Sequence, residues 1–286
     1  MNRRYFVTGG TGFIGRALVK RLLARTDTQC IYLLTRRPAA SLPSADPRIR
    51  VWSGDITTVK FPDTPITHLI HAAAEANDLL QPDQPRYYYT VVEGTRRVFD
   101  WARQQEIPNT LFVSSGIVEK DCDTVYCRAK RMGEFIGKLI LPSFKIARVY
   151  SVVGEEMPLN GQYALGKFIY EAQYTGRVTY YPSKATRSYM HVDDVAEWLE
   201  AVMDKGIINK PYDVGGAWPI DVTDLAHYVA NLWGVPCESR MAQPRDSYYV
   251  PSLMPSLIDL GVTQKILLHE ALLRVKRYLE EKDGKH

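Results

Sequence analysis

Short apolar runs alternate with segments of helical character along the first half of the chain. The apolar runs cover residues 4–10, 30–36, 48–55, 68–74, 110–116 and 143–154. Residues 15–25 have apolar positions three and four apart, as in an amphipathic helix, and residues 87–106 are a second helix candidate. Strands that alternate with helices in this way predict an α/β fold, with a parallel sheet and helices on both of its faces.

The pattern changes from about residue 153. Glycine, proline, tyrosine and polar residues become more frequent there, which is typical of a region of loops, helix and short strand that covers a substrate. More regular patterns follow and predict a strand over 211–216 and helices over 191–206, 221–234 and 263–282. Asp193 and Asp194 stand at the start of the first of these helices, where we expect them to cap it.

The segment TGGTGFIG, residues 8–15, follows the first predicted strand and opens the first predicted helix. Glycine at every third position allows a tight turn and a close approach of the backbone to a pyrophosphate. The helix start adds free N–H groups and the positive end of a helix dipole. These features predict a dinucleotide loop made by Gly9, Thr11, Gly12, Phe13, Ile14 and Gly15. A tight turn without a ligand is the alternative.

With this loop, the predicted fold is a Rossmann-type doubly wound parallel sheet with a smaller C-terminal substrate-binding region. The dinucleotide-binding domain is predicted over 1–152, and the segment 187–216 is expected to return to it. The substrate-binding region is predicted over 153–186 and 217–286.

The residues after the second predicted strand indicate which dinucleotide is bound. An acid about 20 residues past the glycines would accept hydrogen bonds from the ribose hydroxyls and favour NAD(H). This chain has Thr35 at that point, followed by Arg36 and Arg37. Guanidinium groups bind a 2′-phosphate through charge-assisted hydrogen bonds. The prediction is NADP(H) rather than NAD(H), and a solvated arginine pair on a loop is the alternative.

Composition and charge exclude several other classes of function. The chain is 45% apolar and 24% charged with a formal charge of +4, and its charges are mixed rather than gathered in a stripe that would bind nucleic acid. The chain has no run of 18 apolar residues, so we expect no membrane span. Glycines soon interrupt the first apolar run, so we expect no cleavable leader and predict a cytoplasmic protein. Neither the cysteines nor the histidines have the spacing of a metal site or of a disulfide framework.

Nine segments together resemble the extended short-chain dehydrogenase/reductase family, in the group that acts on nucleotide-linked sugars as epimerases, dehydratases and 4-ketoreductases. The resemblance covers residues 4–280. The segments are TGGTGFIG (8–15), GDIT (54–57), HAAA (71–74), EGTRRV (93–98), VSSG (113–116), YCRAK (126–130), RVYSVVG (148–154), RSYMHVDDVA (187–196) and YDVGG (212–216).

The resemblance implies roles for individual residues. Asp55 and Ile56 would contact the adenine. The residues Ala72, Ala73 and Ala74 would lie along the cofactor. The substrate diphosphate would be bound by Ser151, Arg187 and Arg245.

The resemblance also implies a catalytic set. Ser115 would bind the substrate oxygen, Tyr126 would be the general acid/base, and Lys130 would hold the nicotinamide ribose and lower the pKa of the tyrosine. The pairing of Tyr126 with Lys130 also has a physical basis apart from the resemblance. Residues four apart share a helix face, and a nearby ammonium stabilises a phenolate.

The chain departs from the family pattern at several positions. Thr90 and Ser151 stand where the family often has asparagine, and the stretch between Ser115 and Tyr126 is shorter than usual. Dehydratases of the family have an Asp-Glu pair directly after the catalytic serine or threonine, whereas this chain has Gly116 and Ile117. Neither can act as an acid or base, so dehydration is disfavoured.

We therefore predict an NADPH-dependent reduction of a keto group, in particular the 4-keto group of a deoxygenated nucleotide-linked sugar. Three alternatives stay open: an epimerase with a tightly held NAD(P), an NADPH reductase of a ketone without a nucleotide, and a non-catalytic NADP-binding regulatory module. The resemblance further implies a homodimer through the helices over 87–102 and 126–137, unless Arg96, Arg97 and Lys138 mark solvent-facing positions.

Overall fold

The computed structural model describes residues 2–36, 42–74, 83–120, 123–159, 163–241 and 246–284. It divides into two compact units. The first comprises Met1–Val149, Val195–Val214 and Leu253–Val262. The second comprises Tyr150–Asp194, Gly215–Ser252 and Thr263–His286.

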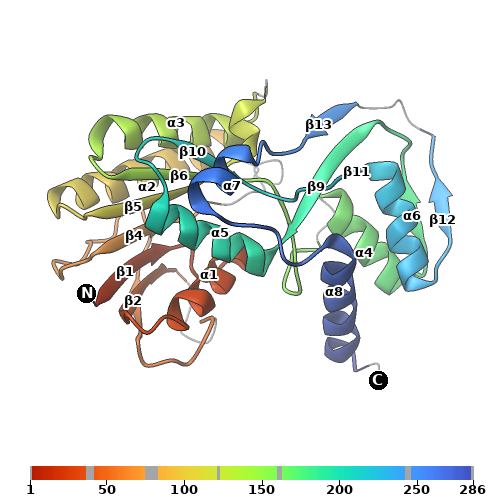
Figure 1. Ribbon diagram of the computed structural model, residues 1–286, viewed down its shortest axis with the longest axis horizontal. Helices are drawn as coiled ribbons and strands as arrows, with labels where there is room; N and C mark the ends of the chain where they lie inside the picture. The colour runs from red at the N-terminus through yellow and green to blue at the C-terminus, as the bar shows by residue number, and fades with distance from the viewer. Residues whose placement is uncertain are drawn as a thin grey trace. The chain divides into compact units, whose positions relative to one another are not determined.

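The first unit is built around a sheet in which the described residues form seven strands, all paired in parallel (Figure 1). The order is β10-β6-β5-β4-β1-β2-β3. Because the order reverses beside β1, the sheet is doubly wound. The strands are β1 (Arg3–Thr8), β2 (Thr28–Thr35), β3 (Ile49–Ser53), β4 (His68–His71), β5 (Asn109–Ser115), β6 (Phe144–Val149) and β10 (Pro211–Val214). The predicted Rossmann-type fold is confirmed.

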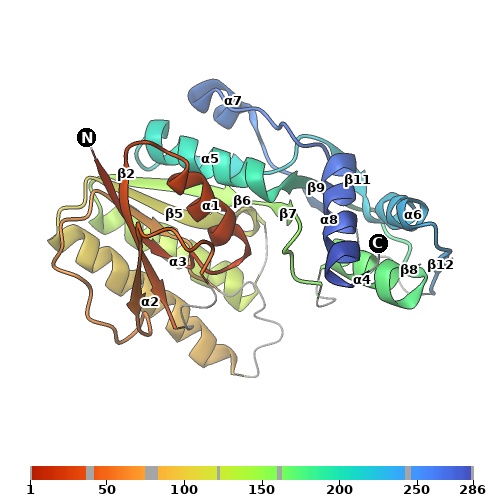
Figure 2. The same cartoon turned by 90° about the horizontal axis from the view of Figure 1, so that it is seen from below.

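Helices cover both faces of this sheet, as Figure 2 shows from below. On one face lie α2 (Gln84–Gln104) and α3 (Val125–Ile140), and on the other lie α1 (Phe13–Leu23) and α5 (Val192–Lys205). A core of buried residues, including Phe6, Phe99 and Phe144, fills the space between the sheet and α2 and α3. Apart from the edge strand β3, the strands are largely buried, which explains their almost continuous apolar runs.

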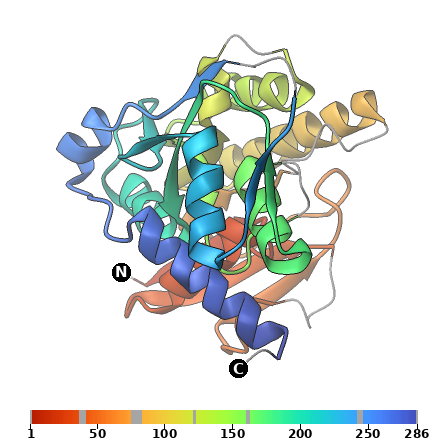
Figure 3. The same ribbon diagram turned by 90° about the vertical axis from the view of Figure 1, so that its right-hand side faces the viewer.

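The second unit has its own core. Its strands are β7 (Ser151–Val153), β8 (Val178–Tyr180), β9 (Ala185–His191), β11 (Pro219–Asp221), β12 (Cys237–Ser239) and β13 (Ser247–Tyr249). Strand β9 pairs with β7, β11 and β13. The helices are α4 (Ala164–Thr175), α6 (Val222–Trp233) and α8 (Leu268–Lys282), drawn in green, cyan and dark blue in Figure 3. Apolar residues of these helices, such as Phe168, Leu225 and Leu272, form the core.

The run 143–154, predicted as one strand, forms two strands that belong to different units. Strand β6 pairs with β5 and β10 in the large sheet, whereas β7 pairs with β9. The chain changes its pairing partners at Tyr150, which lies between the two strands. The apolar pattern does not change at this position, because β6 is largely buried and the residues of β7 are half-buried or buried.

Two segments lie in a different unit from the one expected. Helix α7 (Met254–Leu260) belongs to the first unit and packs on β10, where Ser256 donates a hydrogen bond to the Asp213 carbonyl and Asp259 pairs with Lys210. Residues 187–194 belong to the second unit, because β9 pairs only with strands of that unit among the described residues.

Asp194 has a different role from the helix cap expected of it. Its carboxylate is buried and accepts hydrogen bonds from the backbone N–H groups of Lys265 (3.0 Å) and Ile266 (2.8 Å). The segment before α8 is therefore held in a non-helical conformation, and the helix begins at Leu268 rather than at residue 263.

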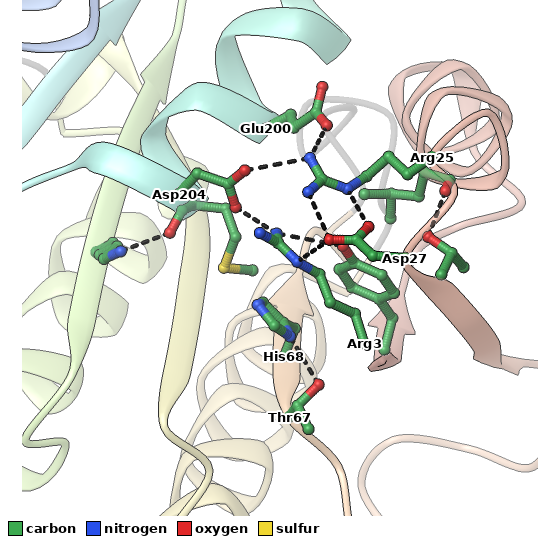
Figure 4. Close-up of polar contacts among 12 residues, drawn as sticks. Arg3, Arg25, Asp27, Thr67, His68, Glu200 and Asp204 are labelled. Atoms are coloured by element: carbon green, nitrogen blue, oxygen red, sulfur yellow. Dashed lines mark hydrogen bonds and ion pairs between the residues drawn. The ribbon is translucent and has the colours of Figure 1, made fainter. Parts of the chain in front are cut away.

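A network of charged side chains ties α5 to the amino-terminal edge of the large sheet (Figure 4). Asp204 of α5 pairs with Arg3 of β1 and lies 3.1 Å from Arg25, which also pairs with Glu200. Asp27 lies 3.0 Å from Arg3 and 2.8 Å from Arg25, and the hydrogen bonds from Arg25 lower its pKa to about 2. The network joins elements that are more than 170 residues apart in the chain.

The described part of the chain contains neither a membrane-spanning helix nor a metal cluster. None of its helices is long and apolar enough to cross a bilayer. Its His, Cys, Asp and Glu side chains form no group of three or more that could hold a metal ion. The cytoplasmic location stays a prediction.

We expect Asp204→Asn to lower the free energy of unfolding by about 2 kcal/mol, because Arg3 and Arg25 lose a shared charged acceptor. The matched control is Asp100→Asn, which removes a carboxylate from an ion pair with Arg96 within α2 and should cost about 0.5 kcal/mol. Urea denaturation measures both changes. Equal losses of unfolding free energy in the two variants would contradict the view that the network stabilises the fold more than a surface ion pair does.

Candidate functional site

The glycine loop lies at the point where the order of the strands reverses. Gly9 follows β1 with φ +75°, and a Cβ added to it would lie 2.7 Å from the backbone of both Ala72 and Ala73, which follow β4. A Cβ on Gly15 would lie 2.1 Å from the Gly9 carbonyl oxygen. The two chain segments can therefore pack this closely only with glycine at these positions.

The start of α1 is open to an anion. Its cap, Gly12, has no side chain to accept the first N–H groups, and the first turn has no acidic residue. Thr11, Phe13 and Ile14 lie at this start, so their backbone is next to the positive end of the helix dipole. Glycine where backbones meet, together with an open helix start, fits the pyrophosphate of a dinucleotide.

The predicted ribose and adenine residues follow the neighbouring strands β2 and β3. Thr35 ends β2 and is buried, and Arg36 follows it with an exposed side chain. The guanidinium of Arg36 lies 3.8 Å from the Asp55 carboxylate. Hydrogen bonds from Thr57, with a smaller contribution from the Arg36 charge, lower the pKa of Asp55. Arg37 lies outside the described residues.

The remaining cofactor residues lie beside this edge of the sheet. Ala72 and Ala73 donate their N–H groups to the backbone and hydroxyl oxygens of Thr8, at 3.1 and 3.2 Å, and Ala74 follows them. Ile56 is half-buried, and its side chain lies where a Cβ on Gly94 of α2 would be. Ile56 is therefore also part of the packing of α2.

The three predicted catalytic residues come from neighbouring elements of the first unit. Ser115 ends β5, and its hydroxyl accepts a hydrogen bond from the Ile117 N–H (3.4 Å) at the start of the 3-10 helix η3 (Gly116–Glu119). Thr124 caps α3, on which Tyr126 and Lys130 follow. The short connection is thus a single turn of 3-10 helix and a capped α-helix, with residues 121–122 outside the described part.

Lys130 is buried at the centre of this group. Its ammonium donates a hydrogen bond to the Val113 carbonyl (2.7 Å) and lies 4.8 Å from the Phe112 ring centre and 5.9 Å from that of Tyr126. Burial lowers the pKa of Lys130 to about 8, while the nearby Glu134 carboxylate raises it. Lys130 therefore changes charge close to neutral pH.

The predicted substrate residues belong to the second unit. Ser151 begins β7, and Arg187 lies on β9. The Arg187 guanidinium donates hydrogen bonds to Ser247 and to the Thr186 carbonyl and lies 5.9 Å from the Tyr249 ring centre. No carboxylate pairs with Arg187 among the described residues, so its charge is not neutralised there. Arg245 lies outside those residues.

A buried polar cluster that the sequence analysis did not predict lies next to the predicted catalytic residues. The Glu134 carboxylate on α3 accepts hydrogen bonds from Ser114 (2.6 Å) and from Arg148 on β6 (2.9 and 2.8 Å), and Arg148 also pairs with Glu119. Glu134 stands four residues after Lys130, and this helical spacing is the signal in the sequence that could have indicated the cluster.

Thr90, which stands where the family often has asparagine, makes a hydrogen bond within its own helix: its hydroxyl donates to the Arg86 carbonyl.

Comparisons with known proteins agree on one group of enzymes. A family model described as the NAD dependent epimerase/dehydratase family matches residues 5–215. UDP-glucuronic acid decarboxylase 6 of Arabidopsis thaliana is 24% identical over 95% of this chain and 87% of its own length. Two solved structures have the same fold. One is the dTDP-glucose 4,6-dehydratase DesIV of Streptomyces venezuelae with NAD bound (TM-score 0.83, 21% identity, 98% of each chain). The other is a UDP-glucose 4-epimerase of Thermotoga maritima with UDP-glucose (TM-score 0.83, 19% identity, 98% of this chain and 99% of that one).

We expect Gly9→Ala to lower the free energy of unfolding by about 3 kcal/mol, because the new methyl group would collide with the Ala72 and Ala73 backbone in addition to the cost of a positive φ. Gly261→Ala is the matched control. It lies in the same unit with φ +66° and open space around its Cβ, and should cost only about 1 kcal/mol. Denaturant titration compares them, and equal losses would contradict the close packing.

Proposed function

Because the chain belongs to the NAD dependent epimerase/dehydratase family, within the extended short-chain dehydrogenase/reductase group, we propose that it is an enzyme that transfers a hydride between a nicotinamide dinucleotide and a nucleotide-linked sugar. The observation that carries the proposal is the gathering of the glycine loop, the ribose-side arginine and the serine, tyrosine and lysine at one edge of a single sheet. Membership in a family of enzymes counts against the non-catalytic regulatory module.

In the proposed reaction, residues of the first unit carry out the proton transfer. Ser115 donates a hydrogen bond to the oxygen of the sugar carbonyl, and Tyr126 gives that oxygen its proton. Lys130, in its charged form, favours loss of the proton from Tyr126 and would hold the nicotinamide ribose. The nicotinamide, when bound, supplies the hydride. The Gly9–Gly15 loop and the start of α1 would bind the pyrophosphate.

Reduction with NADPH is the form of the reaction that we favour. Arg36 directly follows β2 with an exposed side chain, where it can bind a 2′-phosphate, and Arg37 follows it in the sequence. The DesIV structure contains NAD, so the preference for NADP(H) is a proposal for this chain alone. The proposed substrate is a 4-keto, deoxygenated nucleotide-linked sugar, with Ser151, Arg187 and Arg245 as candidates for binding its diphosphate.

An epimerase is the second candidate, because relatives with that activity share the whole fold. In this case the hydride would return to the same sugar and the cofactor would not be consumed. Dehydration has less support, because Gly116 and Ile117 offer no acid and Glu119 is already paired with Arg148. A ketone without a nucleotide would leave the charge of Arg187 without a function.

A homodimer through α2 and α3 also stays a proposal. Met132, Phe135 and Leu139 of α3 are exposed and lie three and four residues apart on one helix face, and Tyr89 of α2 is exposed as well. This apolar stripe supports pairing with a second copy of the chain. Arg96 is exposed but paired with Glu93 and Asp100 of its own helix.

We expect Arg36→Ala to weaken NADPH binding about tenfold or more, because the charge-assisted bonds to the 2′-phosphate would be lost, and to leave NADH binding almost unchanged. Fluorescence titration of both cofactors with the wild type and the variant measures the difference. If NADH binds the wild type as tightly as NADPH, and the variant changes neither, the proposed preference is wrong.

With a 4-keto nucleotide-linked sugar, we expect NADPH to be consumed in equal amount to the product formed. Near-ultraviolet absorbance follows the cofactor, and chromatography follows the product. Tyr126→Phe should fold normally and lower the rate about 10²- to 10⁴-fold, because the proton donor is lost. Turnover without net loss of NADPH would refute the reductase and favour the epimerase.

A further inference from the structure

The Glu134–Arg148 ion pair joins α3, the helix of Tyr126 and Lys130, to β6, the strand that pairs with β5. Glu134 is only 6% exposed, and its two carboxylate oxygens accept hydrogen bonds from Nε and Nη2, which lie on one edge of the Arg148 guanidinium. Ser114, the neighbour of Ser115 in β5, donates a third hydrogen bond to the same carboxylate. Strand register explains the meeting, because Ser114 and Arg148 are partners in the β5–β6 pairing. The carboxylate is thus fixed from two strands.

This fixed carboxylate lies one helical turn from Lys130. Both side chains are buried on α3, and residues four apart lie on the same helix face. Taking an ammonium out of water disfavours its charge, whereas a carboxylate within a few ångströms restores it. Fixing Glu134 through Arg148 and Ser114 therefore fixes the strength of this second effect.

Among the described residues, the other groups packed around Lys130 do not supply the negative charge. From β4, His71 is fully buried, and its pKa falls to about 3, so it stays neutral. From β5, Lys130 contacts the Val113 carbonyl and the Phe112 ring, which are uncharged. From β6, Arg148 is positive and bound to Glu134. On α3 itself, Tyr126 is the partner that Lys130 is proposed to act upon.

We propose that Glu134, held by Arg148 and Ser114, is a positioning residue that keeps the Lys130 amine protonated and so sets the pH range in which Tyr126 can work. The effect on Lys130 is a property of the cofactor-free protein. Its consequence for catalysis rests on the proposed function. A purely structural pin between α3 and the sheet would hold the helix equally well without acting on the charge of Lys130.

The test is the titration of Lys130 by NMR in the cofactor-free protein, with ¹³C-labelled lysine and assignment from Lys130→Arg. The expected midpoint in the wild type is about 8. In Glu134→Gln it should fall by about one pH unit or more, because the carboxylate is removed and the positive Arg148 remains. The high-pH limb of the kcat/KM profile should move by a similar amount.

Glu119→Gln is the matched control. It removes the other carboxylate that pairs with Arg148, but from an exposed position on η3, and should leave the Lys130 midpoint within a few tenths of a unit. An unchanged midpoint in Glu134→Gln overturns the inference and leaves the proposed function standing. A shifted midpoint with an unmoved kcat/KM limb overturns the catalytic part alone. If the protein has no activity on any sugar nucleotide, the proposed function fails, while the NMR result still decides the effect on Lys130.

Glu134→Gln leaves Arg148 without its buried partner, which can prevent folding. The double variant Glu134→Gln/Arg148→Gln replaces the ion pair with two amides and provides a second route. Its Lys130 midpoint should also fall below that of the wild type, though by less than in the single variant. A midpoint equal to that of the wild type would again overturn the inference.

Discussion

The candidate site depends on the close contact between the backbone after β1 and the backbone after β4. At this point Gly9 leaves no room for a side chain between itself and Ala72 and Ala73. The contact exists because β1 and β4 are neighbours with their carboxyl ends at the same edge, where the strand order reverses. Because all the described strands of this sheet run in the same direction, the remaining candidate residues of the first unit follow strand ends at that same edge.

Features that depend on neighbouring residues could be predicted from the sequence. The strand ends, the glycine loop and the helical spacing of Tyr126 and Lys130 each depend on a stretch of only a few residues. The partner of Glu134 was not predictable, because Arg148 stands on another element and meets it only through the pairing of β5 with β6. For the same reason, the division of 143–154 into two strands could not be predicted: an apolar run shows burial and not the identity of its partner strand.

The two units divide the proposed work. The cofactor and proton-transfer residues belong to the first, and Ser151 and Arg187 belong to the second. The first unit is a regular parallel sheet with helices on both faces, whereas the second has short strands and irregular segments. A chain of this design can change its substrate through the second unit while its hydride and proton chemistry stays the same.

The discontinuity of the first unit has a consequence for biosynthesis. A ribosome that has completed residue 149 has made six of the seven strands of the large sheet, and β6 then presents an unpaired edge. The partner strand β10 follows only after the first segment of the second unit, and α7, which packs on β10, comes still later. Until roughly sixty more residues are made, which takes a few seconds, the nascent chain exposes the edge of β6 that is paired in the folded protein. During this time the edge must not pair with other chains.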